Sequence, residues 1–235
     1  MTEFKLRRDV GVRLVKSNAS DADVVQAARV STQGVDSLGE VGKPAGLINY
    51  LMRDRHGSPF EHTSFTFLVE APLFVAREHM RHRAGWSYNE ESGRYKELEG
   101  SFYAPGKDRP LIQVGKPGAY VFEQGTSEQS RDTREGLELS YRASWFYYQR
   151  LLEDGIAREV ARMVLPVGLF TSYYATCNAR SLMHFLSLRT ISEGSLFPSF
   201  PQREIEMVAE QMEAALEKSM PLTYAAFGRH GRVAP

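Results

Sequence analysis

Apolar side chains along this chain follow two repeats, one of three to four residues and one of two residues. Steps of three and four are typical of a helix with one buried face. They run longest between residues 127 and 154, where Tyr141, Trp145 and Tyr148 follow one another. This spacing predicts helices over residues 21–30, 43–55, 73–83, 127–154, 158–165, 179–190 and 202–220. Alternating or β-branched stretches predict strands over residues 4–15, 63–69, 102–103 and 170–176.

Polar segments rich in glycine and proline separate these elements. We expect loops or turns over residues 31–34, 58–62, 85–100, 107–118 and 192–201, and a flexible tail over residues 228–235. Ser20, with Asp23 three positions later, is typical of a helix start, because a serine oxygen accepts a hydrogen bond from the backbone there. With no internal repeat and no clear linker, the pattern indicates one α+β domain over residues 1–235.

Composition limits the function classes. The 235 residues suffice for a sizeable core, and 29 Lys plus Arg are balanced by 29 Asp plus Glu. A general binder of nucleic acid or of membrane surfaces would carry a basic excess, so we expect neither. A single cysteine, Cys177, excludes an internal disulfide and favours a cytoplasmic location. No apolar run approaches the length of a membrane span, and no signal peptide is expected.

One polar stretch, residues 76–95, concentrates candidate chemistry. Arg77 and Arg81 are four apart on the expected helix and would share a face, and guanidinium groups match phosphate oxygens. The following loop offers hydroxyl, amide and carboxylate groups, and Gly85 and Gly93 allow close backbone approach. The stretch therefore predicts a site for a ligand with phosphate and hydroxyl groups, such as a nucleotide. A solvated helix face is the alternative for the arginine pair.

Weaker signals lie further along the chain. Arg158 and Arg162 repeat the four-residue spacing, and an exposed face of a short helix explains them equally well. Asn178 marks a helix N-terminus, which favours anions, although asparagine is a good cap in any helix. Cys177 beside it has the chemistry of a nucleophile, but a lone cysteine at a strand end is more often a small buried hydrophobe.

Two other functions stay open at this point. Four of the six histidines lie between His56 and His82, which suggests a metal-dependent nucleotide phosphohydrolase. Their spacing is weak evidence for a metal and no H-E-x-x-H motif occurs, so we expect no metal. Arginine and aromatic side chains interleave between Arg81 and Tyr95, which suggests a non-enzymatic nucleic-acid binder.

Taken together, the motifs resemble those of the flavin-dependent thymidylate synthases. The signature of that family is R-H-R followed, after seven or eight residues, by Ser, commonly within R-H-R…S-x-N-E-x-S-x-R-Y. Here Arg81, His82 and Arg83 precede Ser92, and the flanking positions are filled by Ser87, Asn89, Glu90, Arg94 and Tyr95. Further matches cover residues 28–31, 59–62, 158–162, 165–166, 178–182 and 188–189.

The resemblance implies reductive methylation of deoxyuridylate (dUMP) to thymidylate (dTMP). Methylenetetrahydrofolate would donate the carbon, and FAD reduced by NADPH would supply the hydride. It further implies a central, mostly antiparallel sheet flanked by helices, and a homotetramer with active sites shared between subunits.

Residue by residue, the resemblance implies two sets of contacts. Contacts to FAD would come from Ser31, His56, Ser58, Glu61, Arg81, His82, Arg83, Glu90, Asn178, Arg180 and His184. Contacts to dUMP would come from Glu78, Arg81, Glu90, Ser92, Gly93, Arg94, Arg162 and Arg189. Arg189 would be the catalytic cation, because a fixed positive charge favours ionisation of the pyrimidine at N3.

Three positions depart from the family pattern. The R-H-R to Ser spacing is eight rather than the seven of many members, so residues 84–86 are expected to bulge. Glu78 stands where many members have Gln, and a carboxylate would accept from a sugar hydroxyl but repel phosphate. His184 stands where some members have Asn.

Overall fold

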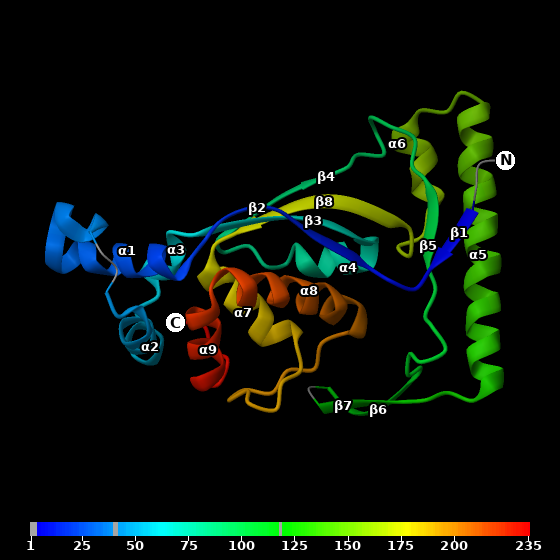
Figure 1. The fold of residues 1–235 in the computed structure, drawn as a ribbon. Helices are drawn as coiled ribbons and strands as arrows, with labels where there is room; N and C mark the ends of the chain where they lie inside the picture. Colours follow the sequence, from blue (N-terminus) through cyan, green and yellow to red (C-terminus); the bar gives the residue numbers. More distant parts are fainter. Residues whose placement is uncertain (1–3, 40–41, 118) are drawn as a thin grey trace. The chain divides into compact units, whose positions relative to one another are not determined.

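The structure is a computed structural model that describes residues 4–39, 42–117 and 119–235. Helices and strands occur in mixed order along the chain (Figure 1). The strands are β1 (Phe4–Arg7), β2 (Gly11–Asn18), β3 (Ser64–Pro72), β4 (Trp86–Glu90), β5 (Gly100–Tyr103), β6 (Ile112–Lys116), β7 (Ala119–Glu123) and β8 (Phe170–Cys177). The helices are α1 (Asp21–Gln33), η1 (Gly34–Leu38), α2 (Pro44–Arg53), α3 (Ser58–Glu61), α4 (Leu73–His79), α5 (Ser127–Glu153), α6 (Arg158–Ala161), η2 (Arg162–Val164), α7 (Ala179–Arg189), α8 (Arg203–Ser219) and α9 (Pro221–Arg229).

The main sheet has four strands in the order β2-β3-β8-β4. Along β8, Thr171, Tyr173, Ala175 and Cys177 are buried at every second position, as the pleat of a strand dictates. Helix α8 packs on β2, and α7 packs against α8 (Figure 1). The predicted α+β class, with an antiparallel sheet flanked by helices, is therefore confirmed.

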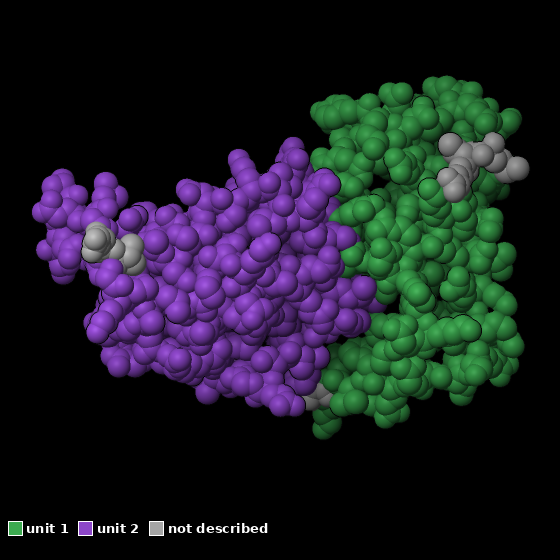
Figure 2. All heavy atoms as spheres, viewed as in Figure 1, with its two compact units in different colours: residues 1–10, 70–78, 90–172 green, residues 11–69, 79–89, 173–235 purple. Residues whose placement is uncertain are grey.

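The chain forms two compact units, each described here by itself (Figure 2). Unit 1 comprises residues 1–10, 70–78 and 90–172. Its core is built on α5, whose Tyr141, Trp145 and Tyr148 are buried one or two turns apart. Phe102 of β5 stacks on Tyr141 with ring centroids 4.9 Å apart. Strand β5 pairs in parallel with β1, so the first segment of unit 1 joins the core formed by its last segment.

Unit 2 comprises residues 11–69, 79–89 and 173–235. Its centre is the buried face of α7, formed by Leu182, Met183, Phe185 and Leu186, all fully buried. Helix α8 covers this face, and α9 packs against both α2 and α8. Because α7 is enclosed in this way, it offers a rigid support for whatever side chains it carries at its two ends.

Several predicted boundaries are wrong, and each has a local cause. The strand expected over residues 4–15 is divided into β1 and β2, which belong to different sheets. Helix α1 continues through Ser31 and Thr32, because their hydroxyls donate to Ala28 O and Arg29 O of the same helix. It ends at Gly34, which adopts a φ of 55°.

Three predicted loops contain regular structure. The turn at 58–62 includes the short helix α3, and the 85–100 loop includes β4. The 107–118 loop includes β6, which pairs antiparallel with β7 so that Lys116 lies opposite Ala119. The Pro117-Gly118 pair between them is a turn signal, although Gly118 itself lies outside the described residues.

The tail expected over residues 228–235 is packed in the structure. Residues 221–229 form α9, and Arg232 beyond it is 6% exposed and paired with Glu213 at 2.6 Å. Arg55 Nη1 donates to Val233 O at 3.0 Å. The expectation of a flexible tail is therefore wrong, because specific side chains bind this backbone.

Candidate functional site

The polar stretch 76–95 is a short helix, a turn and a strand. Helix α4 ends at His79, four residues before the predicted end. Arg81 and His82 therefore lie outside it, and the expected shared faces with Arg77 and Glu78 do not form. Tyr88 of β4 explains the early stop, since its hydroxyl lies 2.9 Å from both His79 O and His82 O. His79 O also accepts from His82 N at 3.0 Å, so the turn after the helix is closed by one backbone hydrogen bond and one side-chain hydroxyl.

His79 is the buried centre of this stretch. Its ring is fully buried among four aromatic side chains, with centroid distances of 4.7 to 5.7 Å, from Trp86, Tyr88, Tyr173 and Phe185. Nδ1 lies 2.9 Å from the Tyr173 hydroxyl. Burial, with smaller contributions from His82 and Arg189, lowers the pKa of His79 to about 3, so the ring is neutral.

Sequence reasoning missed this role of His79. It considered His79 only as one of the histidines of a possible metal cluster. The available signal was the alternation of Trp86 and Tyr88 with Ser87 and Asn89, which is the period of a half-buried strand.

His82 and Arg189 meet across 107 residues of sequence. Arg189 Nε donates to His82 Nε2 at 3.2 Å. His82 is half-buried, and burial first, then the positive charges of Arg189 and His184, lower its pKa to about 4. A neutral imidazole that accepts at Nε2 carries its proton on Nδ1. The structure thus brings together three predicted residues, since the His184 ring lies 6.4 Å from that of His82.

The start of α7 packs on the turn that follows the R-H-R triplet. Asn178 caps the helix by accepting from Ser181 N at 2.8 Å, as predicted. Ser181 Oγ donates to Ala84 O at 2.9 Å. Gly85 has a φ of +70°, and a Cβ there would lie 2.1 Å from Ser181 Oγ. Only glycine fits this turn, which holds Asn178 beside the triplet.

A second group of predicted flavin residues lies around Arg180. Its Nη1 pairs with Glu61 at 2.5 Å, and its Nε donates to Pro235 O at 2.5 Å. Exposed pairs of this kind add little stability, so their main effect is to orient the side chains. His56 stacks on Tyr50 with centroids 5.4 Å apart, and Ser58 begins α3.

Most predicted nucleotide residues lie in unit 1. A cavity of about 150 Å³ there is lined by Leu73, Glu90, Glu91, Gly93, Leu98, Arg162, Leu165, Leu169, Phe170 and Thr171. Thr171 Oγ1 donates to Glu90 Oε1 at 2.7 Å, which fixes that carboxylate. A Cβ at Gly93 would lie 2.8 Å from Leu98 Cδ1 and 3.3 Å from Arg162 Cδ. The structure therefore brings Glu90, Gly93 and Arg162 together.

Ser92 and Arg94 belong to the same loop but are not among the residues that line the cavity. Arg94 Nε donates to Glu159 Oε2 at 2.9 Å, and its backbone N–H lies 3.3 Å from Ser92 Oγ. Glu91 anchors the loop by accepting from Ser172 N at 2.8 Å. The loop is thus held in place by hydrogen bonds at both its ends.

The two sets of predicted contacts divide between the units. Every predicted FAD residue except Glu90 lies in unit 2, where Arg81 and Arg83 are exposed between α4 and β4. Every predicted dUMP residue except Arg81 and Arg189 lies in unit 1, including Glu78 on α4. The sequence alone gave no sign of this division.

Two alternatives considered from the sequence, a metal site and a cysteine nucleophile, receive no support from the structure. Among residues 4–39, 42–117 and 119–235, no group of three His, Cys, Asp or Glu side chains is arranged to hold a metal ion. Cys177 is 2% exposed and burial raises its pKa well above the usual value, which agrees with the predicted buried hydrophobe rather than a nucleophile.

None of the helices in the described part of the chain has the length and apolarity that crossing a membrane requires.

Comparison with known proteins identifies a family and several close relatives in sequence and structure. A family model described as "Thymidylate synthase complementing protein" matches residues 13–222. Flavin-dependent thymidylate synthases of Streptomyces avermitilis and Streptomyces coelicolor are 65% and 62% identical to the chain. The alignments cover 97% and 99% of this chain and 95% and 96% of those proteins. The structure of a UMP/dUMP methylase, PolB, from Streptomyces cacaoi has a TM-score of 0.92 at 55% identity, covering 99% of this chain and 100% of that one.

This α+β fold sets Arg189 against the neutral imidazole of His82 and places Arg162 beside a small cavity. A protein with such arginines is suited to anionic ligands. These matches are more specific, and they show that the chain belongs to the thymidylate synthase complementing protein family. The predicted resemblance is thereby confirmed, and the phosphohydrolase alternative is not supported.

Proposed function

We propose that the chain is a flavin-dependent thymidylate synthase that methylates dUMP reductively to dTMP. The observation that carries the proposal is the contact between Arg189 and His82, which joins the predicted catalytic cation to the predicted flavin triplet at 3.2 Å. Relatives of this name at 65% and 62% identity support it. The solved methylase from Streptomyces cacaoi, described as bound with 5-Br dUMP, supports a uridine nucleotide as the substrate.

The residues present suit a flavin dinucleotide. The exposed guanidinium groups of Arg81 and Arg83 match a diphosphate, and Asn178 at the start of α7 and His184 within it add further polar groups. Bound FAD, reduced by NADPH, would supply the hydride that completes the new methyl group. Within this scheme the neutral His82 orients Arg189 without adding a second positive charge.

The nucleotide is assigned to the cavity and loop of unit 1. Arg162 would bind the phosphate, because a guanidinium group forms paired hydrogen bonds with phosphate oxygens. Glu90, fixed by Thr171, would accept from a sugar hydroxyl or a ring N–H. Gly93 lets the side chains of Leu98 and Arg162 lie close to the backbone of this loop. Arg189 would stabilise negative charge on the pyrimidine as the ring is activated for attack on methylenetetrahydrofolate.

Flavin absorbance and tritium release test this proposal. The purified protein should be yellow or bind added FAD, and should release tritium from 5-tritiated dUMP only with both methylenetetrahydrofolate and NADPH. A protein that binds no FAD and forms no dTMP overturns it. We also propose a homotetramer, which the resemblance implies, and a cytoplasmic location, which the single cysteine favours. Light scattering of the purified protein tests the first.

One observation gives a reason to test UMP as a second substrate. The Streptomyces cacaoi protein is described as a UMP/dUMP methylase and was solved with 5-Br UMP. Parallel assays with 5-tritiated UMP should show a lower kcat/KM than with dUMP if this chain is a thymidylate synthase. Equal values for the two nucleotides would assign it instead to methylation of both.

A further inference from the structure

The end of α7 is held by a polar network that the proposed reaction does not use directly. Arg189 is the last residue of α7, and Thr190 follows it with 4% exposure. Thr190 closes the helix, because both its N–H and its Oγ1 donate to Leu186 O, at 3.0 and 2.8 Å. Helix ends fray readily when nothing outside the helix holds them. The contacts of Thr190 therefore decide how firmly the backbone of Arg189 is fixed.

Arg232, from the segment after α9, reaches Thr190. Its Nη2 donates to Thr190 Oγ1 at 2.8 Å, and its Nη1 pairs with Glu213 at 2.6 Å. Tyr224 supports Glu213 by donating to the same carboxylate at 2.9 Å. Arg232 has 6% of its surface exposed, and burial of a charge at this depth is tolerated only because both partners are present.

The backbone of Arg232 is strained in a way that fits this role. Its φ is 55°, a left-handed conformation that residues with side chains seldom adopt. Such strain persists where the surrounding contacts over-determine the conformation. Here the turn is fixed by Arg232 N, which donates to Phe227 O at 2.9 Å, and by Leu196 N, which donates to Gly231 O at 2.9 Å. The turn directs the guanidinium group at Thr190.

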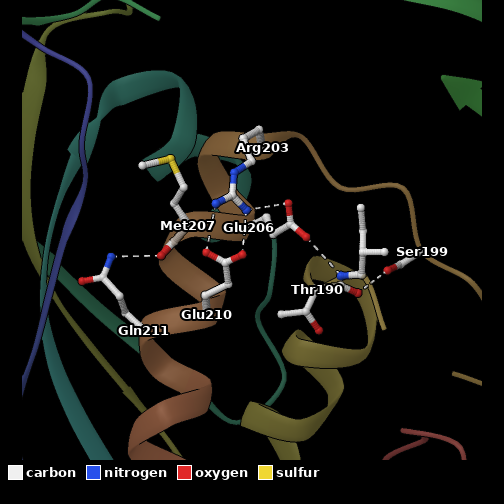
Figure 3. A network of polar contacts seen from close by, with 8 residues as sticks. Thr190, Ser199, Arg203, Glu206, Met207, Glu210 and Gln211 are labelled. Carbon is white, nitrogen blue, oxygen red and sulfur yellow. Dashed lines mark hydrogen bonds and ion pairs between the residues drawn. The ribbon is translucent and has the colours of Figure 1, made fainter. Parts of the chain in front are cut away.

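Further contacts hold the same segment, as Figure 3 shows. Ser199 Oγ donates to Thr190 O at 2.5 Å. Ile191 N donates to Glu206 Oε1 at 3.2 Å, and Arg203 pairs with the other oxygen of Glu206 at 2.8 Å. Thr190 is thus bound through both its backbone and its side chain, and Ile191 through its backbone.

We propose that Arg232 is a positioning residue for Arg189, acting through Thr190 to keep the arginine against His82. The inference adds to the proposed function and rests on it only for the effect on turnover. The matched variants are Thr190→Val, which removes the acceptor for Arg232, and Arg232→Gln, which removes the donor. Thr190→Ser keeps the hydroxyl, and Arg229→Gln removes a nearby arginine that contacts Asn49 instead.

The decisive measurement is an NMR titration of His82, assigned by its loss in His82→Gln. The charged or titratable groups that act on His82 are Arg189 and His184, with His79 close by. Loosening of Arg189 should raise the pKa of His82 by roughly half a unit or more in Thr190→Val and Arg232→Gln. Thr190→Ser and Arg229→Gln should leave it unchanged. A loss of overall stability alone would not move this titration.

Turnover gives the second readout. In the two test variants kcat for dTMP formation should fall roughly 10- to 100-fold with flavin still bound, because small displacements of a catalytic group are costly. Folded variants with an unchanged His82 titration and wild-type kcat overturn the proposal. If Arg232→Gln does not fold, Thr190→Val decides by the same criteria. A wild-type protein without methylation would refute the proposed function, while the titration would still test the positioning of Arg189.

Discussion

Arg189 donates to His82 through its Nε, the guanidinium nitrogen that is bonded to the aliphatic part of the side chain. The contact engages Nε of a side chain that is partly buried. It also fixes His82 as a neutral ring protonated at Nδ1. A cation whose orientation is set by an uncharged neighbour keeps its full charge, which suits stabilisation of an anionic pyrimidine.

Replacement of Arg189 separates catalysis from flavin binding. Arg189→Ala should lower kcat for dTMP formation at least about 100-fold, because it removes the preorganised charge. The absorbance of bound flavin should persist. The pKa of His82 should rise above about 4 yet stay below the ordinary value of 6.5, since burial is the larger cause of its depression. Retained turnover in Arg189→Ala would contradict the catalytic assignment.

Arg162 is expected to act on nucleotide binding. Arg162→Leu should raise KM for dUMP about 10- to 100-fold, the range expected for loss of a hydrogen bond to a charged group. The flavin spectrum should not change, because every predicted flavin residue except Glu90 lies in unit 2. Arg158→Leu is the control, as Arg158 is an exposed arginine four residues earlier whose nearest acidic contact is Glu97 at 3.7 Å. Equal effects of the two substitutions would remove Arg162 from the nucleotide site.

His79 should make the fold sensitive to acid. Its folded pKa of about 3 is below the value of 6.5 for an exposed histidine, so the unfolded chain binds the proton first as pH falls. Its contribution to stability is therefore complete above about pH 6.5 and is lost progressively below it. The loss approaches about 1.4 kcal/mol per pH unit and levels off below the folded pKa.

Urea unfolding at several pH values measures this effect. Between about pH 6 and pH 4.5 the wild type should lose roughly 2 kcal/mol more stability than His79→Phe, which keeps an aromatic ring in the cage but cannot be protonated. His62→Phe serves as the control, because His62 is exposed. Parallel pH profiles for the wild type and His79→Phe would show that the buried ring does not govern acid sensitivity.

Alanine substitutions at Gly85 and Gly136 should have opposite effects on the stability of the protein. Gly85→Ala should destabilise the protein by about 1–3 kcal/mol, since its φ of +70° is strained for alanine and the new Cβ would meet Ser181 Oγ at 2.1 Å. Gly136→Ala should stabilise by about 0.5–1 kcal/mol, because it lies inside α5 with open space around it. Chemical denaturation measures both, and a neutral Gly85→Ala would show that the turn after the triplet adapts.

Helices with a regular apolar face were predictable from sequence. Helix α5 was predicted within one residue of its observed ends, because Tyr141, Trp145 and Tyr148 repeat over many turns and Thr126 caps its start. Helix α4 was not, since its end is set by the hydroxyl of Tyr88, which lies on a later strand. Local periodicity contains no information about such a partner.

The candidate site shows the same limit. The density of arginine and histidine pointed to residues 76–95, but the contact of His82 with Arg189 spans 107 residues and follows no spacing rule. Only the family resemblance predicted that Arg189 belongs to the site. The packing of Arg232 on Thr190 had no sequence signal at all, because a charged residue near a chain end usually indicates an exposed tail.

The position of Cys177 has a practical consequence. It is the single cysteine of the chain, and its thiol is buried at the end of β8 with a raised pKa, so it reacts poorly with maleimides in the folded protein. An exposed position changed to cysteine would therefore become the one site that a fluorescent or spin label modifies. Cysteines introduced at two exposed positions, one in unit 1 and one in unit 2, would then carry a pair of labels that reports the distance between the units in solution, without first removing a native thiol.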